Sequence, residues 1–135
     1  MGRWFAATAV AIAVTLPVAR PVHADVGDAL RHPLKRMAPV TFTVTAYTAG
    51  PESTGKRPGD PWYGITARGT VARRGICAAD PSIPFGTRLW IEGYGIATVE
   101  DRGGAIKGAR LDVFTPVLED ALCWGVKRCK VVMLD

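Results

Sequence analysis

Short stretches of alternating polar and apolar residues recur along most of this chain. Threonine alternates with an apolar residue from residue 41 to residue 46, the pattern of a strand with one buried face. Later stretches are separated by glycine and proline, which end strands. Many short strands with one helix predict a mainly β protein built as a small barrel. The expected strands lie near residues 41–47, 70–79, 88–92, 96–101, 110–114 and 130–134.

One helix is expected after the fifth of these strands. Thr115 is a suitable N-cap, Pro116 suits the first turn, and Gly125 can end the helix. Its charged residues should face water, and four apolar residues share the other face. These four are Val117, Leu118, Ala121 and Leu122.

The segment 49–64 is rich in glycine, proline, serine and charge, and it predicts a long loop. A loop of this length in a small domain is more often functional than merely connecting.

The first 24 residues have the composition of a secretory signal peptide. A short basic start precedes an apolar run from Trp4 to Leu16, and a small-x-small pattern ends at Ala24. The run is too short for an ordinary membrane span, although a buried N-terminal helix is the alternative. We therefore expect export to the periplasm or to the cell wall and extracellular space, without a membrane anchor. Residues 25–38 would be an arm or linker before a domain at 39–135.

The chain carries a formal net charge of +5. Without residues 1–24 it keeps 15 basic residues (17 less Arg3 and Arg20) against 12 acidic ones, a net charge of +3. A mild positive charge suits an anionic polymer such as a cell wall, although this signal is weak. Basic residues do not form a run with interleaved aromatic residues, so we expect no nucleic acid partner.

Three cysteines occur, and export permits disulfides. Cys123 and Cys129 flank Gly125, so a local bridge between them is the disulfide candidate. Cys77 would then be unpaired, and it is better explained as a small buried side chain than as a nucleophile.

Three aspartates follow strand-like stretches: Asp80, Asp101 and Asp112. Carboxylates at strand ends can converge, and converging carboxylates cannot all ionise at their usual pH. Such a cluster can supply a general acid that works near neutrality. The alternative is three ordinary turn aspartates, since Asp-Pro and Asp-x-Gly are common in turns.

From Thr45 onward the sequence resembles the three-Asp ("3D") domain family, which includes stationary-phase survival proteins and the C-terminal domain of a membrane-bound lytic transglycosylase. The most specific match is Asp-x-Gly-Gly-x-Ile-x-Gly at 101–108, followed by a further aspartate at 112. The other matching stretches are 46–50, 52–56, 63–69, 78–81, 83–87, 93–95, 111–114 and 124–127.

The resemblance implies a six-stranded double-psi β-barrel with one or two short helices. It also implies cleavage of the β-1,4 bond between N-acetylmuramic acid and N-acetylglucosamine in peptidoglycan, with a 1,6-anhydro product. By position Asp112 matches the catalytic acid/base, and Asp101 and Asp80 match the other two aspartates. Burial and like charge from both should raise the pKa of Asp112.

Further positions match the family's sugar groove or its glycine-rich loop. Each also has an ordinary explanation, as a solvated charge, a core side chain or a turn. The resemblance implies substrate binding by Lys56, Tyr63, Thr66, Arg102, Gly103, Gly104 and Lys107.

Three other functions stay open. A non-catalytic, expansin-like glycan-binding module would use a related barrel, and a hydrolytic glycosidase would need an aspartate that activates water. A calcium or magnesium site of the three aspartates lacks the dense acidic loop of such sites. For the first choice, a lytic transglycosylase, we expect no cofactor. Its partner would be peptidoglycan glycan strands, with a dimer or partner domain as the candidate for the second wall of the groove.

Overall fold

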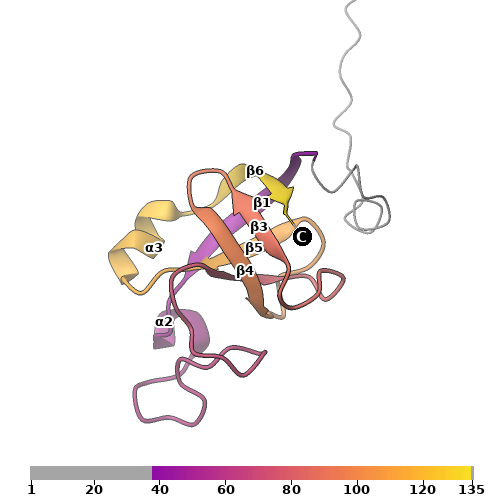
Figure 1. Ribbon diagram of the computed structural model, residues 1–135. Coiled ribbons are helices and arrows are strands. Elements are labelled where there is room, and N and C mark those ends of the chain that lie inside the picture. Colours follow the sequence, from indigo (N-terminus) through magenta and orange to yellow (C-terminus); the bar gives the residue numbers. More distant parts are fainter. Residues whose placement is uncertain (1–37, 135) are drawn as a thin grey trace, which may run out of the picture.

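The computed structural model describes residues 38–134, which form six strands and two short helices (Figure 1). The expected signal peptide and nearly all of the expected arm lie outside the described residues. In chain order the elements are β1 (Val40–Tyr47), α2 (Pro51–Thr54), β2 (Ile76–Ala79), β3 (Arg88–Ile91), β4 (Gly95–Asp101), β5 (Arg110–Phe114), α3 (Leu118–Trp124) and β6 (Lys127–Met133).

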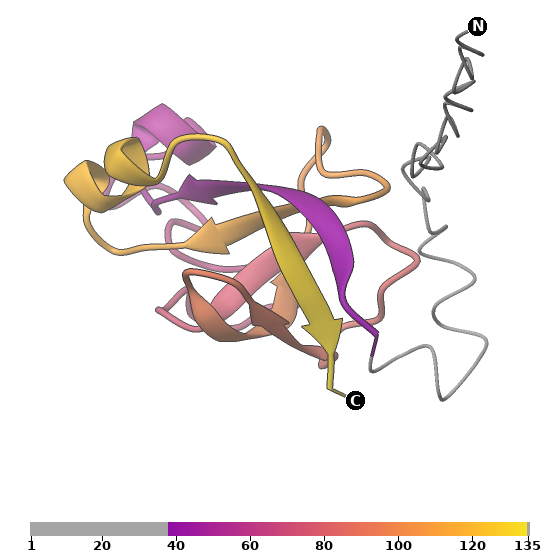
Figure 2. The same ribbon diagram turned by 90° about the horizontal axis from the view of Figure 1, so that it is seen from above.

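The six strands close into a barrel in the order β1-β5-β2-β4-β3-β6. Two neighbouring pairs, β1 with β5 and β2 with β4, are parallel, and the other four pairs are antiparallel. Figure 2 shows β6 running beside β1, its antiparallel neighbour. The expected mainly β class, a closed six-stranded barrel with two short helices, is confirmed. The two parallel pairs and the crossed strand order fit the double-psi topology.

Alternation along the strands fills the barrel. On β1 the buried side chains are those of Phe42 and Val44, and on β5 those of Leu111 and Val113. Because side chains alternate between the two faces of a strand, the residues between them face outward. Each of the six strands turns side chains inward in this way, and together they form one apolar core.

Residues 70–75 do not continue a strand, as the sequence pattern had suggested. The strand β2 begins only at Ile76, because Gly75 has a φ of 94° and breaks the extended backbone. The preceding residues fold back on themselves instead, with an isolated bridge between Ile65 and Val71. In Figure 1 the chain between β1 and β2 protrudes beyond one end of the barrel.

The helix α3 starts later than expected, at Leu118, with Val117 at the N-cap position. The Thr115 hydroxyl accepts a hydrogen bond from the Val117 amide at 3.3 Å, so it stabilises the turn before the helix rather than its first turn. Of the expected apolar face only Ala121 is buried, and Leu122 is 72% exposed. The apolar stripe therefore does not pack on the barrel as an amphipathic helix normally would.

The disulfide candidate is not formed, because all three thiols are free in the structure. Alternation along β6 turns Cys129 into the core, whereas Cys123 lies on the exposed side of α3. Cys77 is fully buried, as its apolar setting indicated. None of the helices within residues 38–134 is long and apolar enough to cross a membrane.

Candidate functional site

Asp112 lies in the middle of β5 and faces outward, between the buried Leu111 and Val113. Its neighbours across the sheet are Thr45 on β1 and Ala78 on β2. The Thr45 hydroxyl donates a hydrogen bond of 3.0 Å to Oδ1 of Asp112.

The surroundings of Asp112 raise the pKa of its carboxyl to about 6. Burial is the main cause, since it disfavours the charged form, and the negative charge of Asp101 acts in the same direction. The hydrogen bond from Thr45 opposes both effects. Asp112 can therefore carry or release a proton near neutrality, as a general acid/base must.

Asp101 ends β4 and is the register partner of Ala78, so β2 separates it from Asp112. Its Oδ2 accepts a hydrogen bond of 2.7 Å from the Tyr47 hydroxyl. Its Oδ1 accepts two more, each of 2.9 Å, from the backbone amides of Ala67 and Arg102. Three donors thus hold this carboxylate in one position.

Tyr47 stays protonated, because burial and the hydrogen bond to Asp101 raise the pKa of its hydroxyl. Its ring packs edge to face on Phe114, with 5.4 Å between ring centroids. The hydroxyl can therefore act only as a fixed donor toward Asp101.

Asp80 has a different part in the structure. Its two oxygens accept backbone hydrogen bonds from Ser82 at 2.8 Å and Gly108 at 2.7 Å. These bonds lower the pKa of Asp80 to about 2, and they tie the turn after β2 to the loop before β5. The raised pKa of Asp112 is caused by burial and Asp101, and Asp80 is not among its causes. The expectation that both other aspartates raise it is therefore wrong for Asp80.

Glu100 anchors the loop that reaches Asp101. It is 5% exposed and accepts hydrogen bonds from both terminal nitrogens of Arg73, each at 2.8 Å, and from the Thr70 hydroxyl at 2.6 Å. Thr66 is also buried, and its hydroxyl lies 2.7 Å from that of Thr70. Thr66 thus shapes the turn whose next residue, Ala67, donates to Asp101.

The other expected substrate residues are dispersed. Arg102 donates to the backbone oxygens of Ala79 and Ile83, and its guanidinium carbon lies 4.1 Å from the Phe85 ring centroid. Arg102 therefore holds the segment after β2 against the end of β4. The remaining residues are the half-buried Lys56 and Tyr63 on the protruding loop, the exposed Lys107 and Gly104, and the half-buried Gly103.

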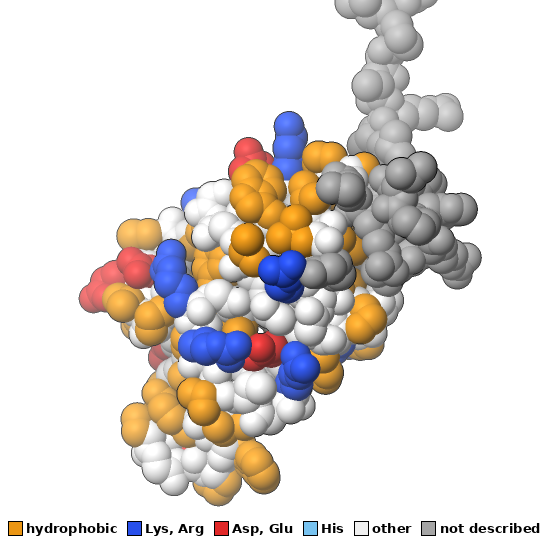
Figure 3. All heavy atoms as spheres, viewed as in Figure 1, with side chains coloured by type: hydrophobic (Ala, Val, Ile, Leu, Met, Phe, Trp, Pro, Cys, Tyr) orange, Lys and Arg blue, Asp and Glu red, His pale blue; other side chains and the backbone are white. Residues whose placement is uncertain are grey.

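Sequence reasoning missed two residues at this site and a third on the protruding loop. Thr45 and Tyr47 lie on the outward face of β1, where alternation along the strand could have placed them beside the aspartates. Trp62, on the protruding loop, is 72% exposed and has a φ of 64°, in the left-handed region. Figure 3 shows hydrophobic side chains on the surface of this protruding part. A large exposed ring on a strained backbone is a functional candidate.

Within residues 38–134, no group of three or more histidine, cysteine, aspartate or glutamate side chains could hold a metal ion. The geometry of the site is that of two carboxyl groups with unlike surroundings, one protonatable and one fixed by three donors.

Residues 76–135, which include all three aspartates, match the family model described as the 3D domain. This part of the chain has the sequence pattern of a 3D domain. The resemblance noted in the sequence is thereby confirmed for the strands from β2 to β6, and β1 precedes the matched residues.

Two proteins of Bacillus subtilis (strain 168) are similar to this chain. One, the cell wall-binding protein YocH, is 42% identical over 101 residues, which are 71% of this chain and 32% of YocH. The other, YabE, carries a provisional name as a cell wall shaping protein, and it is 37% identical over 97 residues. That match covers 71% of this chain and 23% of YabE. The chain thus spans a third or less of the length of these relatives.

Among solved structures, MltA from E. coli is similar, with a TM-score of 0.44 and 26% identity over 53% of this chain and 27% of MltA. A second crystal structure of MltA, a lytic transglycosylase from Escherichia coli, gives a TM-score of 0.45 and 24% identity, with the same coverage.

Proposed function

We propose that this protein is a lytic transglycosylase of peptidoglycan, with Asp112 as its general acid and base. The observation that carries the proposal is the pKa of Asp112, raised to about 6 beside a carboxylate that three donors hold in place. Enzymes commonly place two carboxyl groups in different surroundings, so that one can carry a proton and the other stays ionised.

The reaction needs one proton shuttle. Protonated Asp112 gives its proton to the glycosidic oxygen while the bond from that oxygen to C1 breaks and positive charge develops at C1. The Asp112 carboxylate then takes the proton of the C6 hydroxyl of the same sugar, and O6 bonds to C1. The product is a 1,6-anhydro sugar, water is not consumed, and Asp112 is protonated again.

Asp101 would act as a fixed negative charge. Both of its oxygens accept hydrogen bonds, from Tyr47, Ala67 and Arg102, so the carboxylate is held in one orientation. A preorganised carboxylate near the developing positive charge would lower the energy of the transition state. Its charge would also keep the proton on Asp112 in the resting enzyme.

The names of YocH and YabE support a role at the cell wall. They agree with the expected export of this chain and with peptidoglycan strands as its partner. Because the chain spans at most a third of either relative, a partner domain or second copy that completes the groove is part of the proposal.

A non-catalytic wall-binding module is the second candidate, and two observations favour it. YocH is named for wall binding. The exposed ring of Trp62 offers a flat apolar surface, which suits stacking on a sugar. This candidate needs the ring and does not need a protonatable Asp112.

Mass spectrometry of purified peptidoglycan after incubation with the protein tests the first candidate. The native protein should release fragments with 1,6-anhydro ends. Asp112→Asn should lower the rate at least about a hundredfold, because general acid catalysis typically contributes 10²–10⁴-fold. Glu119→Gln, at an exposed position on α3, is the matched control and should keep full activity. Retained cleavage by a folded Asp112→Asn protein would contradict the assignment.

The second candidate predicts a different outcome of the same experiment. Neither protein would release fragments, both would pellet with the wall, and Trp62→Ala would pellet less than Trp90→Ala, a substitution of another exposed tryptophan. Fragments with ordinary reducing ends would instead indicate hydrolysis.

A further inference from the structure

A pocket lies at one mouth of the barrel, between β1, β5, α3 and the turn before β4. Its volume is about 200 Å³, and Ala46 and Val113 form its floor. These two residues are register partners, and each is next in sequence to a member of the hydrogen-bonded pair Thr45 and Asp112. Since side chains alternate along strands, the pocket opens on the opposite side of the sheet from Asp112.

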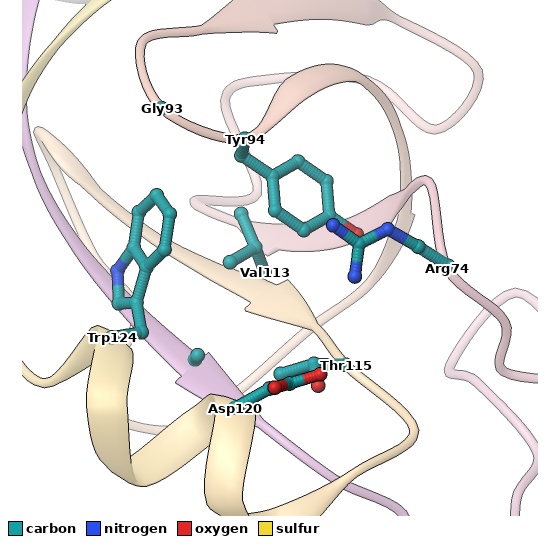
Figure 4. A pocket seen from close by; sticks show the side chains of 8 residues that line it. Arg74, Gly93, Tyr94, Val113, Thr115, Asp120 and Trp124 are labelled. Carbon is teal, nitrogen blue, oxygen red and sulfur yellow. The ribbon is translucent and has the colours of Figure 1, made fainter.

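The walls of this mouth pocket are the rings of Tyr94 and Trp124 (Figure 4). The rings meet edge to face, with 6.1 Å between centroids and 88° between planes. The Tyr94 hydroxyl donates to the Phe114 oxygen at 2.7 Å and accepts from the Gly75 amide at 2.8 Å. The Trp124 Nε1 donates to the Val44 oxygen at 3.0 Å. The polar atoms of both rings are thus committed to backbone groups. The Lys127 Nζ lies 4.2 Å from the centroid of the Trp124 ring and covers one of its faces, so the other face is the one that a ligand can contact.

Two opposite charges stand at the rim. The Arg74 guanidinium carbon lies 5.4 Å from the centroid of the Tyr94 ring, and Asp120 lines the side of α3. Figure 4 shows the Arg74 guanidinium beside the hydroxyl end of Tyr94 and the Asp120 side chain beside Thr115, at the edge of the pocket. In the part of the chain that the structure describes, the Asp120 carboxylate has no hydrogen bond or ion pair, and the Arg74 guanidinium has only its ring contact.

The size of the pocket limits what it can hold. Pockets for drug-sized ligands are about 300–1,000 Å³, so a space of about 200 Å³ suits one amino acid group better than a pair of sugar rings. An ammonium and a carboxylate on the same carbon would match Asp120 and Arg74 together. A short aliphatic stem would lie against the Trp124 ring.

We propose that the mouth pocket binds an amino acid group that carries both an ammonium and a carboxylate. Two sources share this chemistry: a free amino acid, and the free end of a diamino acid in a peptide attached to wall glycan. Only the second source, the wall peptide, rests on the proposed function. The binding of such a group by the pocket is independent of it.

The probe is meso-diaminopimelic acid, which has two such groups joined by an aliphatic chain. Two analogues isolate the charges: heptanedioic acid lacks the amines, and 1,5-diaminopentane lacks the carboxylates. Titration of the whole protein, followed through the NMR signal of the Trp124 indole N–H, should show a saturable shift with the first compound. Each analogue should bind at least tenfold more weakly.

Variants test the two charges separately. Arg74→Gln and Asp120→Asn should each weaken binding of meso-diaminopimelic acid at least tenfold. The controls Arg128→Gln, on the exposed side of β6, and Asp112→Asn should leave it unchanged. Since Asp112→Asn tests cleavage and Arg74→Gln tests the pocket, failure of either proposal can be recognised without the other.

Absence of a saturable shift, or equal binding of all three compounds, would overturn the proposal. A peptide with a free diaminopimelate end identifies the source. If it binds more tightly than the free compound, the site serves the wall, whereas weaker binding assigns the pocket to the free amino acid.

Discussion

Asp112 and Asp101 are the same residue type on strands separated only by β2, yet their surroundings differ. Asp101 receives three hydrogen bonds, whereas the half-buried Asp112 carboxyl receives one, from Thr45. The sequence indicated both residues, and the family resemblance gave the acid/base role to Asp112, but nothing in the sequence separated Asp101 from Asp80. The two carboxylates differ in their backbone donors, which are distant in sequence: the Gly108 amide donates to Asp80, and the Ala67 amide donates to Asp101.

The raised pKa of Asp112 predicts how folding stability varies with pH. Between its usual value of 3.8 and about 6, the unfolded chain releases this proton and the folded protein retains it. Stability must therefore fall as pH rises through this range. Relative to Asp112→Asn, the native protein should lose unfolding free energy between about pH 4 and about pH 7. Urea denaturation of both proteins across this range measures the difference.

Identical pH dependence of the two proteins would mean that Asp112 titrates as an exposed carboxyl does. The role of general acid near neutrality would then lose its physical basis, whatever the cleavage assay showed.

The three cysteines should differ in reactivity. Cys123 is exposed, whereas Cys77 and Cys129 are buried and burial raises the pKa of both thiols, that of Cys77 to about 12. Since the thiolate is the reactive form, a disulfide-exchange reagent should modify one thiol in the native protein and three in denaturant. Cys123→Ser should leave none reactive in the native state. A bridge between Cys123 and Cys129 would instead leave a single reactive thiol in denaturant.

At the scale of elements, alternation located the strands well. The expected strand at 110–114 has the bounds of β5, and the expected strand at 96–101 differs from β4 by one residue. The helix was less well predicted, because Thr115 is a good N-cap by type but bonds within the preceding turn. The start of the helix was thus predicted wrongly because the N-cap preference of Thr115 competes with the turn that follows β5 in the barrel.

The loop between β4 and β5 offers a matched pair of glycines. A Cβ on Gly103 would lie 2.9 Å from Cγ1 of Ile106, which is buried, whereas a Cβ on Gly104 would meet no atom within 4 Å. Overpacking of this kind costs about 1 kcal/mol or more. Gly103→Ala should therefore lower Tm by about 4–8 °C.

Gly104→Ala should change stability by less than about 0.5 kcal/mol. Thermal unfolding followed by circular dichroism measures both variants. Equal Tm values would show that Ile106 moves aside without cost, and that this loop is less tightly packed than its contacts indicate.

At the scale of the whole molecule, the order of strands around the barrel could not be predicted from alternation. Alternation gives the face of each residue but not the neighbour of each strand. The double-psi topology came from the resemblance to the 3D family. The bare apolar stripe on α3 is a second feature of this scale, because Leu118 and Leu122 are exposed where an amphipathic helix would bury them.

The closed strand order predicts that the barrel cannot lose its last strand. A chain that ends at Phe114 lacks β6, which pairs with both β1 and β3. Both strands would then have unpaired edges, and the core would lose Cys129, Val131 and Met133. This truncated chain should show no cooperative thermal transition by circular dichroism. A sharp transition at a lower temperature would show that five strands suffice.

The same strand order determines when the barrel can fold as the chain is released. The first strand of the barrel pairs with the fifth and the sixth, and the contact between Thr45 and Asp112 spans 67 positions of the sequence. When the chain is released from its N-terminus, β1 becomes available for pairing well before β5 and β6, its two neighbours in the barrel. Contacts between distant positions also slow folding. The barrel therefore closes only after β6 has been released, so the candidate acid Asp112 acquires its raised pKa only then.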